Sequence, residues 1–314
     1  MPKQMAGELK PGEPVDSDFL VARCSLRSTR TGGTYLDLLL ADKTGQISGR
    51  MWDATEALAA SIKVDDFVHI KGRAESYQNN IQITARSITQ APTDSLRLGD
   101  FLPQSPFDVA QMFKEFKELL DTVKDPPLRA LLDAFLADKE FCDAFRTCPA
   151  ATANHHAHLG GLLEHTLSMA KLAAKLAEHY PELRGDLLMT GVFLHDIGKT
   201  RELSYRRTFQ YTTPGNLVGH IMLGVLMLED EVRKLPEFPV AKLNMLRHMI
   251  LSHHGQLEFG SPKLPMFAEA MALHYLDNLD AKLKDFSELV AEDRSSDPEW
   301  TEYHPRLARK LYKG

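Results

Sequence analysis

The run His195-Asp196-Ile197-Gly198-Lys199 decides the fold of the second half of this chain. It closes an apolar stretch, residues 187–199, whose composition predicts a buried helix. A histidine and an aspartate side by side on such a helix each cost several kcal/mol to bury without a partner. A bound metal ion would remove that cost and would explain why the two lie together. The run therefore predicts a helical domain built around a metal centre.

The other candidate ligands lie in the same part of the chain. Of the 13 histidines, all but two lie between residues 155 and 274. We predict that the run 160–166, which contains His165, opens a helix to about residue 180 and that His220 opens another through residue 228. His253-His254 ends a helical pattern, and Asp277 belongs to a predicted helix over residues 267–283. We assign the histidines without such a setting to exposed or internally satisfied positions: His179, His248, His274 and His304.

The ligand types indicate which metal the site takes. Imidazole and carboxylate together suit Mn, Fe, Co, Ni or Zn better than Ca or Mg. The predicted set is larger than one ion takes, so we expect two divalent ions, a few ångströms apart and bridged by Asp196. The predicted metal ligands are His165, His195, Asp196, His220, His253, His254 and Asp277.

The first part of the chain has the periodicity of strands. Apolar or alternating runs lie at residues 19–22, 35–40, 46–52, 67–74 and 81–85, with a short apolar helix at 54–61. Three strands, a helix and two further strands follow one another in the order of an OB-fold barrel. From residue 109 on, apolar side chains recur every three or four positions, which is the pattern of helices.

The predicted fold class is therefore multidomain, an N-terminal all-β OB-fold barrel followed by an all-α helical domain. The expected divisions are a flexible tail at 1–12, the barrel at 13–92, a linker at 93–106, the helical domain at 107–290 and a peripheral helix or tail at 291–314.

Composition and charge narrow the classes of function. The net charge of −6 argues against a strongly basic nucleic-acid binder, although a metal site supplies positive charge of its own. No apolar run approaches the roughly 20 residues of a membrane helix, so no membrane partner is expected. Cys24, Cys142 and Cys148 form no CxxC pair, which fits a reducing cytoplasm.

The barrel segment resembles the OB domains of the tRNA-anticodon type, through residues 38–47 and 68–73. The resemblance implies binding of single-stranded nucleic acid, and the residue types needed for it are present. Three aromatic residues could stack on bases and three basic residues could meet phosphates: Tyr35, Trp52 and Tyr77, and Arg50, Lys71 and Arg73. The alternative is that these aromatic side chains fill the barrel core.

His165, His195-Asp196 and Asp277 match the H…HD…D pattern of the histidine-aspartate (HD) superfamily. His220 and His253-His254 match the extra histidines of its two-metal phosphodiesterases. With residues 160–166, 195–199, 252–262 and 274–282 and the OB segment in front, the chain resembles the YhaM family of 3′-5′ exoribonucleases over nearly its whole length. The resemblance implies hydrolysis of single-stranded RNA, or also single-stranded DNA, to nucleoside monophosphates with Mn or a similar ion.

By analogy with two-metal relatives, His165, His195, Asp196 and Asp277 would hold one ion, and Asp196, His220, His253 and His254 the other. His195 and Asp196 are then catalytic, because the ions they hold would generate a hydroxide nucleophile. We expect Lys199 to bind the scissile phosphate, against the alternative of an ordinary cation at a helix C-terminus. Asp280, one turn after Asp277, could orient a ligand histidine.

Two further groups have roles that the sequence leaves open. His155, His156 and His158 could add ligands, donate a proton to the leaving 3′-oxygen or bind phosphate. Arg206 and Arg207 could clamp the RNA backbone, although a solvated loop explains a charge pair alone better.

Three other functions compete with an exoribonuclease. An HD hydrolase could act on a cyclic dinucleotide or a free nucleotide, but such a substrate does not need a second binding domain. Some HD relatives hold two irons and activate oxygen. A nucleic-acid-binding regulator would rely on the OB domain alone, and the intact ligand set argues against it. The sequence leaves open the choice between RNA and DNA, and whether the chain forms a homo-oligomer.

Overall fold

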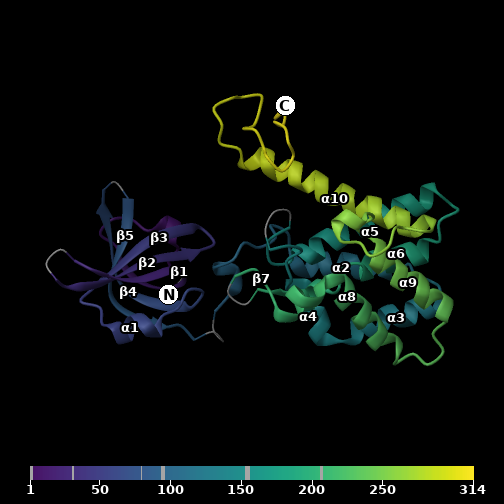
Figure 1. Ribbon diagram of the computed structural model, residues 1–314, viewed down its shortest axis with the longest axis horizontal. Helices are drawn as coiled ribbons and strands as arrows, with labels where there is room; N and C mark the ends of the chain where they lie inside the picture. The colour runs from purple at the N-terminus through teal and green to yellow at the C-terminus, as the bar shows by residue number, and fades with distance from the viewer. Residues whose placement is uncertain (1–2, 30–31, 79, 93–95, 153–155, 206–207) are drawn as a thin grey trace. The chain divides into compact units, whose positions relative to one another are not determined.

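The computed structural model describes residues 3–29, 32–78, 80–92, 96–152, 156–205 and 208–314 (Figure 1). The chain divides into two compact units, and the main division lies between Gln104 and Ser105. The first unit is a closed β barrel and the second is almost entirely helical. The predicted fold class is therefore confirmed.

The barrel has the strand order β1-β2-β3-β5-β4, in which only the β3–β5 pair is parallel. β1 is long enough to pair with β4 along its first half and with β2 along its second. Alternate residues of β2 point inward, so Leu36, Leu38 and Leu40 are fully buried in the barrel. The elements are β1 (Pro14–Ser28), β2 (Thr34–Asp42), β3 (Gly45–Trp52), α1 (Glu56–Ser61), β4 (Phe67–Tyr77) and β5 (Asn80–Gln90), with 3-10 turns η1 (Ala6–Glu8) and η3 (Leu98–Asp100).

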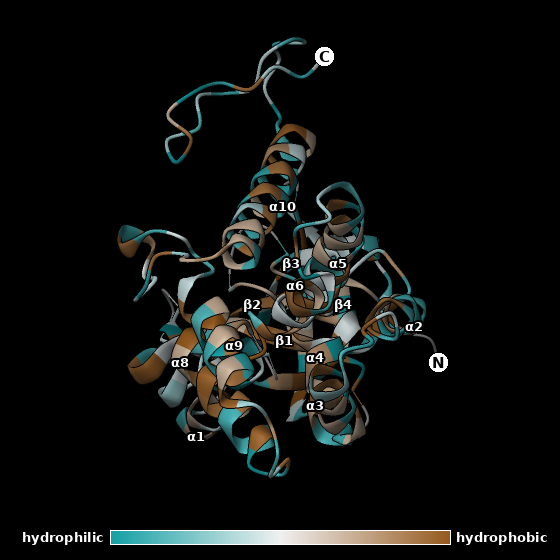
Figure 2. Ribbon diagram, turned by 90° about the vertical axis from the view of Figure 1, so that its right-hand side faces the viewer, coloured by the Kyte–Doolittle hydropathy of each residue, from teal (hydrophilic) through white to brown (hydrophobic). Residues whose placement is uncertain are grey.

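The helical unit surrounds one large core. Its helices are α2 (Val109–Leu120), α3 (Pro126–Ala137), α4 (Lys139–Thr147), α5 (Gly161–His179), α6 (Gly185–Leu194), α7 (Lys199–Glu202), α8 (Thr213–Val232), α9 (Val240–Ser252) and α10 (Ala268–Glu292). A 3-10 turn η4 (Leu257–Phe259) and a two-stranded sheet of β6 (Leu203–Ser204) and β7 (Gln210–Tyr211) complete it. Figure 2 shows apolar and polar residues along the same helices, the pattern of helices that bury one face.

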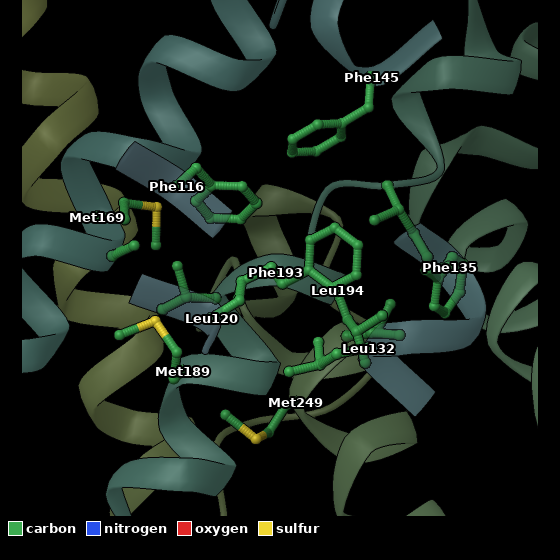
Figure 3. Close-up of a cluster of buried hydrophobic side chains, with 14 of the residues drawn as sticks. Phe116, Leu120, Leu132, Phe135, Phe145, Met169, Met189, Phe193, Leu194 and Met249 are labelled. Atoms are coloured by element: carbon green, nitrogen blue, oxygen red, sulfur yellow. The ribbon is translucent and has the colours of Figure 1, made fainter. Parts of the chain in front are cut away.

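α6 is the exception, because its side chains are buried on all sides from Leu187 to Leu194. The ring of Phe193 lies 5.5 to 5.8 Å from those of Phe116, Phe135 and Phe145 at the centre of the core (Figure 3). A helix that is apolar all round belongs in the interior of a domain. The residues that directly follow α6 therefore lie in the interior as well.

Two predicted helix boundaries were wrong. α6 ends at Leu194, so His195 and Asp196 lie in the turn before α7 and not within a helix. α8 begins at Thr213, where Thr212 caps it by accepting a hydrogen bond from the Gly215 N–H, but the non-helical Gly219 divides it, so its second part begins at His220 as predicted. α10 continues to Glu292, nine residues beyond the predicted end.

Among the residues that the structure describes, no helix is both long enough and apolar enough to cross a bilayer. Cys24, Cys142 and Cys148 carry free thiols, and the latter two are buried in the helical core.

Candidate metal centre

The turn between α6 and α7 carries the central pair of the site. His195 and Asp196 follow the last residue of α6 and are 0% and 2% exposed. A carboxylate buried so deeply needs cations or several donors beside it. Asp196 has such a set of neighbours, all of them histidines or lysine, and the site is built around it.

Five histidine rings near Asp196 share one arrangement, in which Nδ1 lies against an oxygen and Nε2 is turned away from it. Because carbonyl and carboxylate oxygens only accept, Nδ1 donates the proton and Nε2 keeps its lone pair. Metal-ligating histidines are held in this way. The contacts are His165 to Asp280 Oδ2 at 2.7 Å, His195 to Val192 O at 2.7 Å, His220 to Glu202 Oε1 at 3.1 Å, His253 to Ile250 O at 2.7 Å and His254 to Phe259 O at 2.8 Å.

A first group of ligand atoms joins α5, α10 and the turn after α6. His165 Nε2 lies 3.3 Å from His195 Nε2 and 3.3 Å from Asp277 Oδ1. His195 Nε2 in turn lies 3.3 Å from Asp196 Oδ2. Two imidazole nitrogens that face each other with lone pairs repel, so His165 Nε2 and His195 Nε2 must share either a proton or a metal ion.

A second group of ligand atoms faces Oδ1, the other oxygen of Asp196. Asp196 Oδ1 is 3.5 Å from His220 Nε2 and 3.6 Å from His253 Nε2. Nitrogens of His220, His253 and His254 all lie within 4.8 Å of one another. Asp196 thus presents one oxygen to each group.

Both groups fit a divalent transition-metal centre. Nitrogen and oxygen ligands about 2.1 Å from one ion lie about 3.0 to 3.5 Å from each other, and the distances above have this size. Asp196 Oδ1, His220 Nε2 and His253 Nε2 are buried and, among the described residues, have no hydrogen-bond partner. A buried polar atom without a partner is costly, and three of them facing one point indicate a ligand.

Lys199 lies beside the carboxylate rather than at a free helix end. Its Nζ is 2.6 Å from Asp196 Oδ2, and its side chain is 16% exposed. Burial lowers the pKa of Lys199, but the charge of Asp196 outweighs this and raises the pKa above its usual value. Lys199 therefore stays protonated at the edge of the site.

Two carboxylates set the protonation of His165. Burial lowers its pKa, but hydrogen bonds to Asp277 and Asp280 outweigh burial and raise the pKa to about 9. The second group differs, because burial, reinforced by the neighbouring histidines, lowers the pKa of His253 and His254. A cation that binds at His165 must therefore displace a proton, whereas His253 and His254 are already neutral.

Glu202 orients one of the candidate ligands, His220, and was not predicted from the sequence. One of its oxygens accepts both the backbone N–H of His220, at 2.8 Å, and the Nδ1 proton of the same residue. The backbone N–H is available because Gly219, with φ 78° and ψ 157°, breaks α8 one residue earlier. The clearest sequence signal is the Gly219-His220 pair itself, and nothing in it points to Glu202.

Gly198 brings the turn and α8 together. A Cβ atom at this position would lie 1.9 Å from the carbonyl oxygen of His220. Only glycine allows this backbone approach, which fixes the distance between Asp196 and the His220 ligand on the next helix.

The remaining predicted residues of the helical unit lie beside this centre. His156 Nε2 is 3.3 Å from Asp280 Oδ2, and His158 Nε2 is 3.4 Å from Glu164. His274 and His248 are satisfied as expected, by the His253 carbonyl and the Met266 N–H. His155, Arg206 and Arg207 lie outside the described residues.

The predicted nucleic-acid residues form a surface group on the barrel. The rings of Tyr35 and Trp52 are 5.1 Å apart, and Arg50 lies over Tyr35 at 5.9 Å and over Tyr77 at 4.9 Å. Trp52 and Tyr77 are each 46% exposed, so neither fills the barrel core.

Two basic residues of β4 lie on the outside of the same barrel. Lys71 pairs with Asp16 at 3.5 Å, and Arg73 donates to the Gly12 carbonyl at 2.9 Å. Thr84 is the register partner of both Arg73 and Arg50, so the two arginines lie in one row across β4, β5 and β3.

Comparison with known proteins agrees with both units. An HD domain matches residues 162–282, and an OB-fold nucleic acid binding domain matches residues 20–91. A protein of Bacillus subtilis (strain 168) named 3′-5′ exoribonuclease YhaM is 37% identical over 273 residues, which cover 87% of this chain and 86% of that protein. The chain belongs to the YhaM family. YhaM proteins of Geobacillus sp. (strain WCH70) and Listeria monocytogenes serotype 4b (strain CLIP80459) are 38% and 36% identical, over 87% and 88% of this chain and 83% and 88% of their own lengths.

Membership in the YhaM family confirms the resemblance seen in the sequence. It also accounts for the order of the two units, since the matches extend over both of them. The HD match covers His165, His195, Asp196 and Asp277, and it includes the whole second group of histidines.

Proposed function

We propose that this YhaM family member is a divalent-metal-dependent 3′-5′ exoribonuclease that hydrolyses single-stranded RNA to nucleoside monophosphates. One observation carries the proposal: five histidines hold Nδ1 in hydrogen bonds, and four of them bring Nε2 within 4 Å of an oxygen of Asp196, namely His165, His195, His220 and His253. Relatives that match most of this chain are named for that activity.

The ligand groups favour two ions, of which Mn²⁺ is the first choice. His165, His195, Asp196 and Asp277 would hold one, and Asp196, His220, His253 and His254 the other. When bound, such ions lower the pKa of a water molecule toward neutrality and offset charge on the phosphoryl oxygens.

Protein groups supply the positioning. Lys199 is protonated and partly exposed beside Asp196, so it can donate to a phosphate oxygen where negative charge develops. Asp280 and Glu202 hold His165 and His220 in fixed orientations. Such partners raise the basicity of a ligand histidine and fix its tautomer.

The barrel supplies a second contact with the substrate. Tyr35, Trp52 and Tyr77 offer ring faces on which bases of any sequence can stack, and Arg50 can pair with the backbone between them. Arg73 lies in one row with Arg50 across β4, β5 and β3 and adds a second positive charge to this surface. Stacking of this kind needs unpaired bases, which favours a single strand over a duplex.

The test uses full-length protein with Mn²⁺ and single-stranded RNA labelled at its 5′ end. We expect products that shorten progressively from the 3′ end, with release of nucleoside monophosphates. Asp196→Ala should abolish them, and His179→Ala, which changes an exposed histidine outside the centre, should not. Internal cuts alone, hydrolysis of cyclic dinucleotides but not RNA, or full activity of the Asp196→Ala protein would contradict the proposal.

A further inference from the structure

A second cluster of ligand-type side chains lies next to the metal centre but is not part of it. His156 and His158 lie in the turn before α5, and Glu164 lies in its first turn. Their ligand atoms lie within 4.8 Å of one another. His156 is 2% exposed and Glu164 is 8% exposed, so this is an interior cluster and not a group of surface charges.

The distances within the cluster are those of atoms that share an ion. His156 Nδ1 is 3.5 Å from Glu164 Oε1, and His158 Nε2 is 3.4 Å from Glu164 Oε2. These values match the spacing in the metal centre and the separation of about 3.0 to 3.5 Å expected around one ion. His158 Nδ1 faces the Leu159 carbonyl at 3.3 Å, which leaves Nε2 turned toward Glu164.

Asp280 holds His156 in the orientation of a ligand. Its Oδ2 atom lies 3.3 Å from His156 Nε2, so that nitrogen can donate while Nδ1 faces Glu164. The same oxygen accepts the Nδ1 proton of His165. A carboxylate behind a histidine is the usual outer partner in a metal site, and here one carboxylate serves two histidines that face different groups.

The turn that carries the cluster is built for this geometry. His156 has φ 53°, a left-handed conformation that costs free energy for a residue with a side chain. Its carbonyl accepts the Ala150 N–H at 3.1 Å and lies where a Cβ on Gly161 would be only 2.1 Å away. A glycine and a backbone hydrogen bond thus hold His156 in the conformation that brings it beside Glu164.

Glu164 has capacity left for an ion. Ser105 Oγ donates to Oε2 at 2.7 Å, and Lys284 Nζ donates to Oε1 at 2.8 Å. A carboxylate offers about four lone-pair positions, so about two remain. Lys284 neutralises Glu164 but opposes a second cation, so it must weaken ion binding at the cluster.

We infer that His156, His158 and Glu164 form a third divalent-cation site, for Zn²⁺ or a similar transition-metal ion, separate from the paired centre and joined to it through Asp280. Three protein ligands leave one position open. His156 and Glu164 also line a cavity of about 600 Å³ with Asp280 and Lys284, from which water or a small ligand could reach that position. The inference does not depend on the proposed action on RNA.

The test counts ions in full-length protein that has been stripped with a chelator and dialysed against Zn²⁺. We expect His158→Ala to hold one ion per chain fewer than the unmodified protein, and His179→Ala to hold the same number. In Asp196→Ala, which disrupts the paired centre, the cluster should keep its ion, and adding His158→Ala should remove it. An unchanged count on adding His158→Ala in either background would overturn the site.

Lys284→Met should strengthen ion binding at the cluster, whereas His158→Ala should remove it. In the Asp196→Ala background, calorimetric titration with Zn²⁺ should show severalfold tighter binding once the opposing charge is removed. Affinity that stays the same or falls would contradict the assignment. His158→Gln replaces His158→Ala if circular dichroism shows that the alanine variant is unfolded. Failure of the exoribonuclease proposal would appear instead as intact RNA with unmodified protein, whatever the ion count.

Discussion

The Nδ1 atom of His165 donates to Asp280 at 2.7 Å, across the interface between α5 and α10. The residues are 115 positions apart, and their contact orients His165, the ligand that we propose for α5. A carboxylate three positions after the ligand Asp277 on α10 thus controls a ligand on another helix.

Replacing Asp280 should weaken metal binding without removing a ligand of the paired centre. Asp280→Ala leaves His165 without its acceptor, and loss of such a partner lowers metal affinity about 10–100-fold. Titration with Mn²⁺ measures the change. Asp285→Ala, which removes another buried carboxylate of α10 and its pairing with Arg306, is the control. Equal losses in the two variants would assign the effect to folding.

Glu202→Ala should act on the other group of ligands. It removes the acceptor of both His220 N–H groups, and we expect Mn²⁺ affinity to fall about 10–100-fold. Glu202→Gln keeps an acceptor oxygen and should recover part of the loss. Glu229→Ala, which breaks an ion pair between Glu229 of α8 and Arg247 of α9, serves as control. Wild-type affinity in Glu202→Ala would refute a positioning role.

Metal binding should release a proton, and the source should be His165. Its raised pKa of about 9 means that it is protonated at pH 7 in ion-free protein, so affinity should rise with pH up to about 9, by at most about tenfold per unit. Calorimetry in buffers with different ionisation heats counts the released protons. His254→Ala should keep the release, because burial already lowers the pKa of that ring. Affinity independent of pH between 6 and 9 would contradict this.

Gly198→Ala should destabilise the helical unit by about 1–3 kcal/mol, because the new Cβ meets the His220 carbonyl and the backbones must separate. Thermal unfolding in a chelator measures this without the contribution of metal. Gly224→Ala, in α8 near the same contact, has ordinary contacts of 3.5 Å or more and is the matched control. An unchanged Tm in Gly198→Ala would show that the approach of the two elements is loose.

Trp52→Ala should weaken binding of single-stranded RNA by about 1–3 kcal/mol, the contribution of one stacked base. Fluorescence anisotropy with the Asp196→Ala protein measures binding without cleavage. Tyr180→Ala changes a residue of similar exposure, 44%, in the helical unit, and should have no effect. A similar loss in both variants would argue against a specific base contact at Trp52.

The residues that the structure brings together in the candidate metal centre could be named from the sequence because each comes with a local signal. His195-Asp196 ends an apolar run, and His253-His254 ends another. The order of strands around one short helix was equally local, and it identified the barrel. The family resemblance joined these signals into one fold.

The hydrogen-bond partners of the candidate ligands could not be predicted from the sequence, because these hydrogen bonds join distant segments of the chain. Glu202 reaches His220 only because Gly219 breaks α8 and Gly198 lets the chains approach. The end of α6 was predicted too far along the chain for a related reason. The helix ends at Leu194, although the stretch that was predicted to be helical continues through Ile197. Contacts with other segments determine the backbone conformation of the turn between α6 and α7.

The burial of the proposed ligand atoms would tie the folded state of the helical unit to the supply of metal. Asp196, His195 and His253 are withdrawn from water at the end of core helices, and an ion that binds only the folded chain stabilises it by RT ln(1 + [M]/Kd). At a free ion concentration of about 100 times Kd, this amounts to about 2.7 kcal/mol for one site. Metal starvation would therefore lower the amount of folded protein as well as its activity, and unfolded chains are exposed to proteolysis.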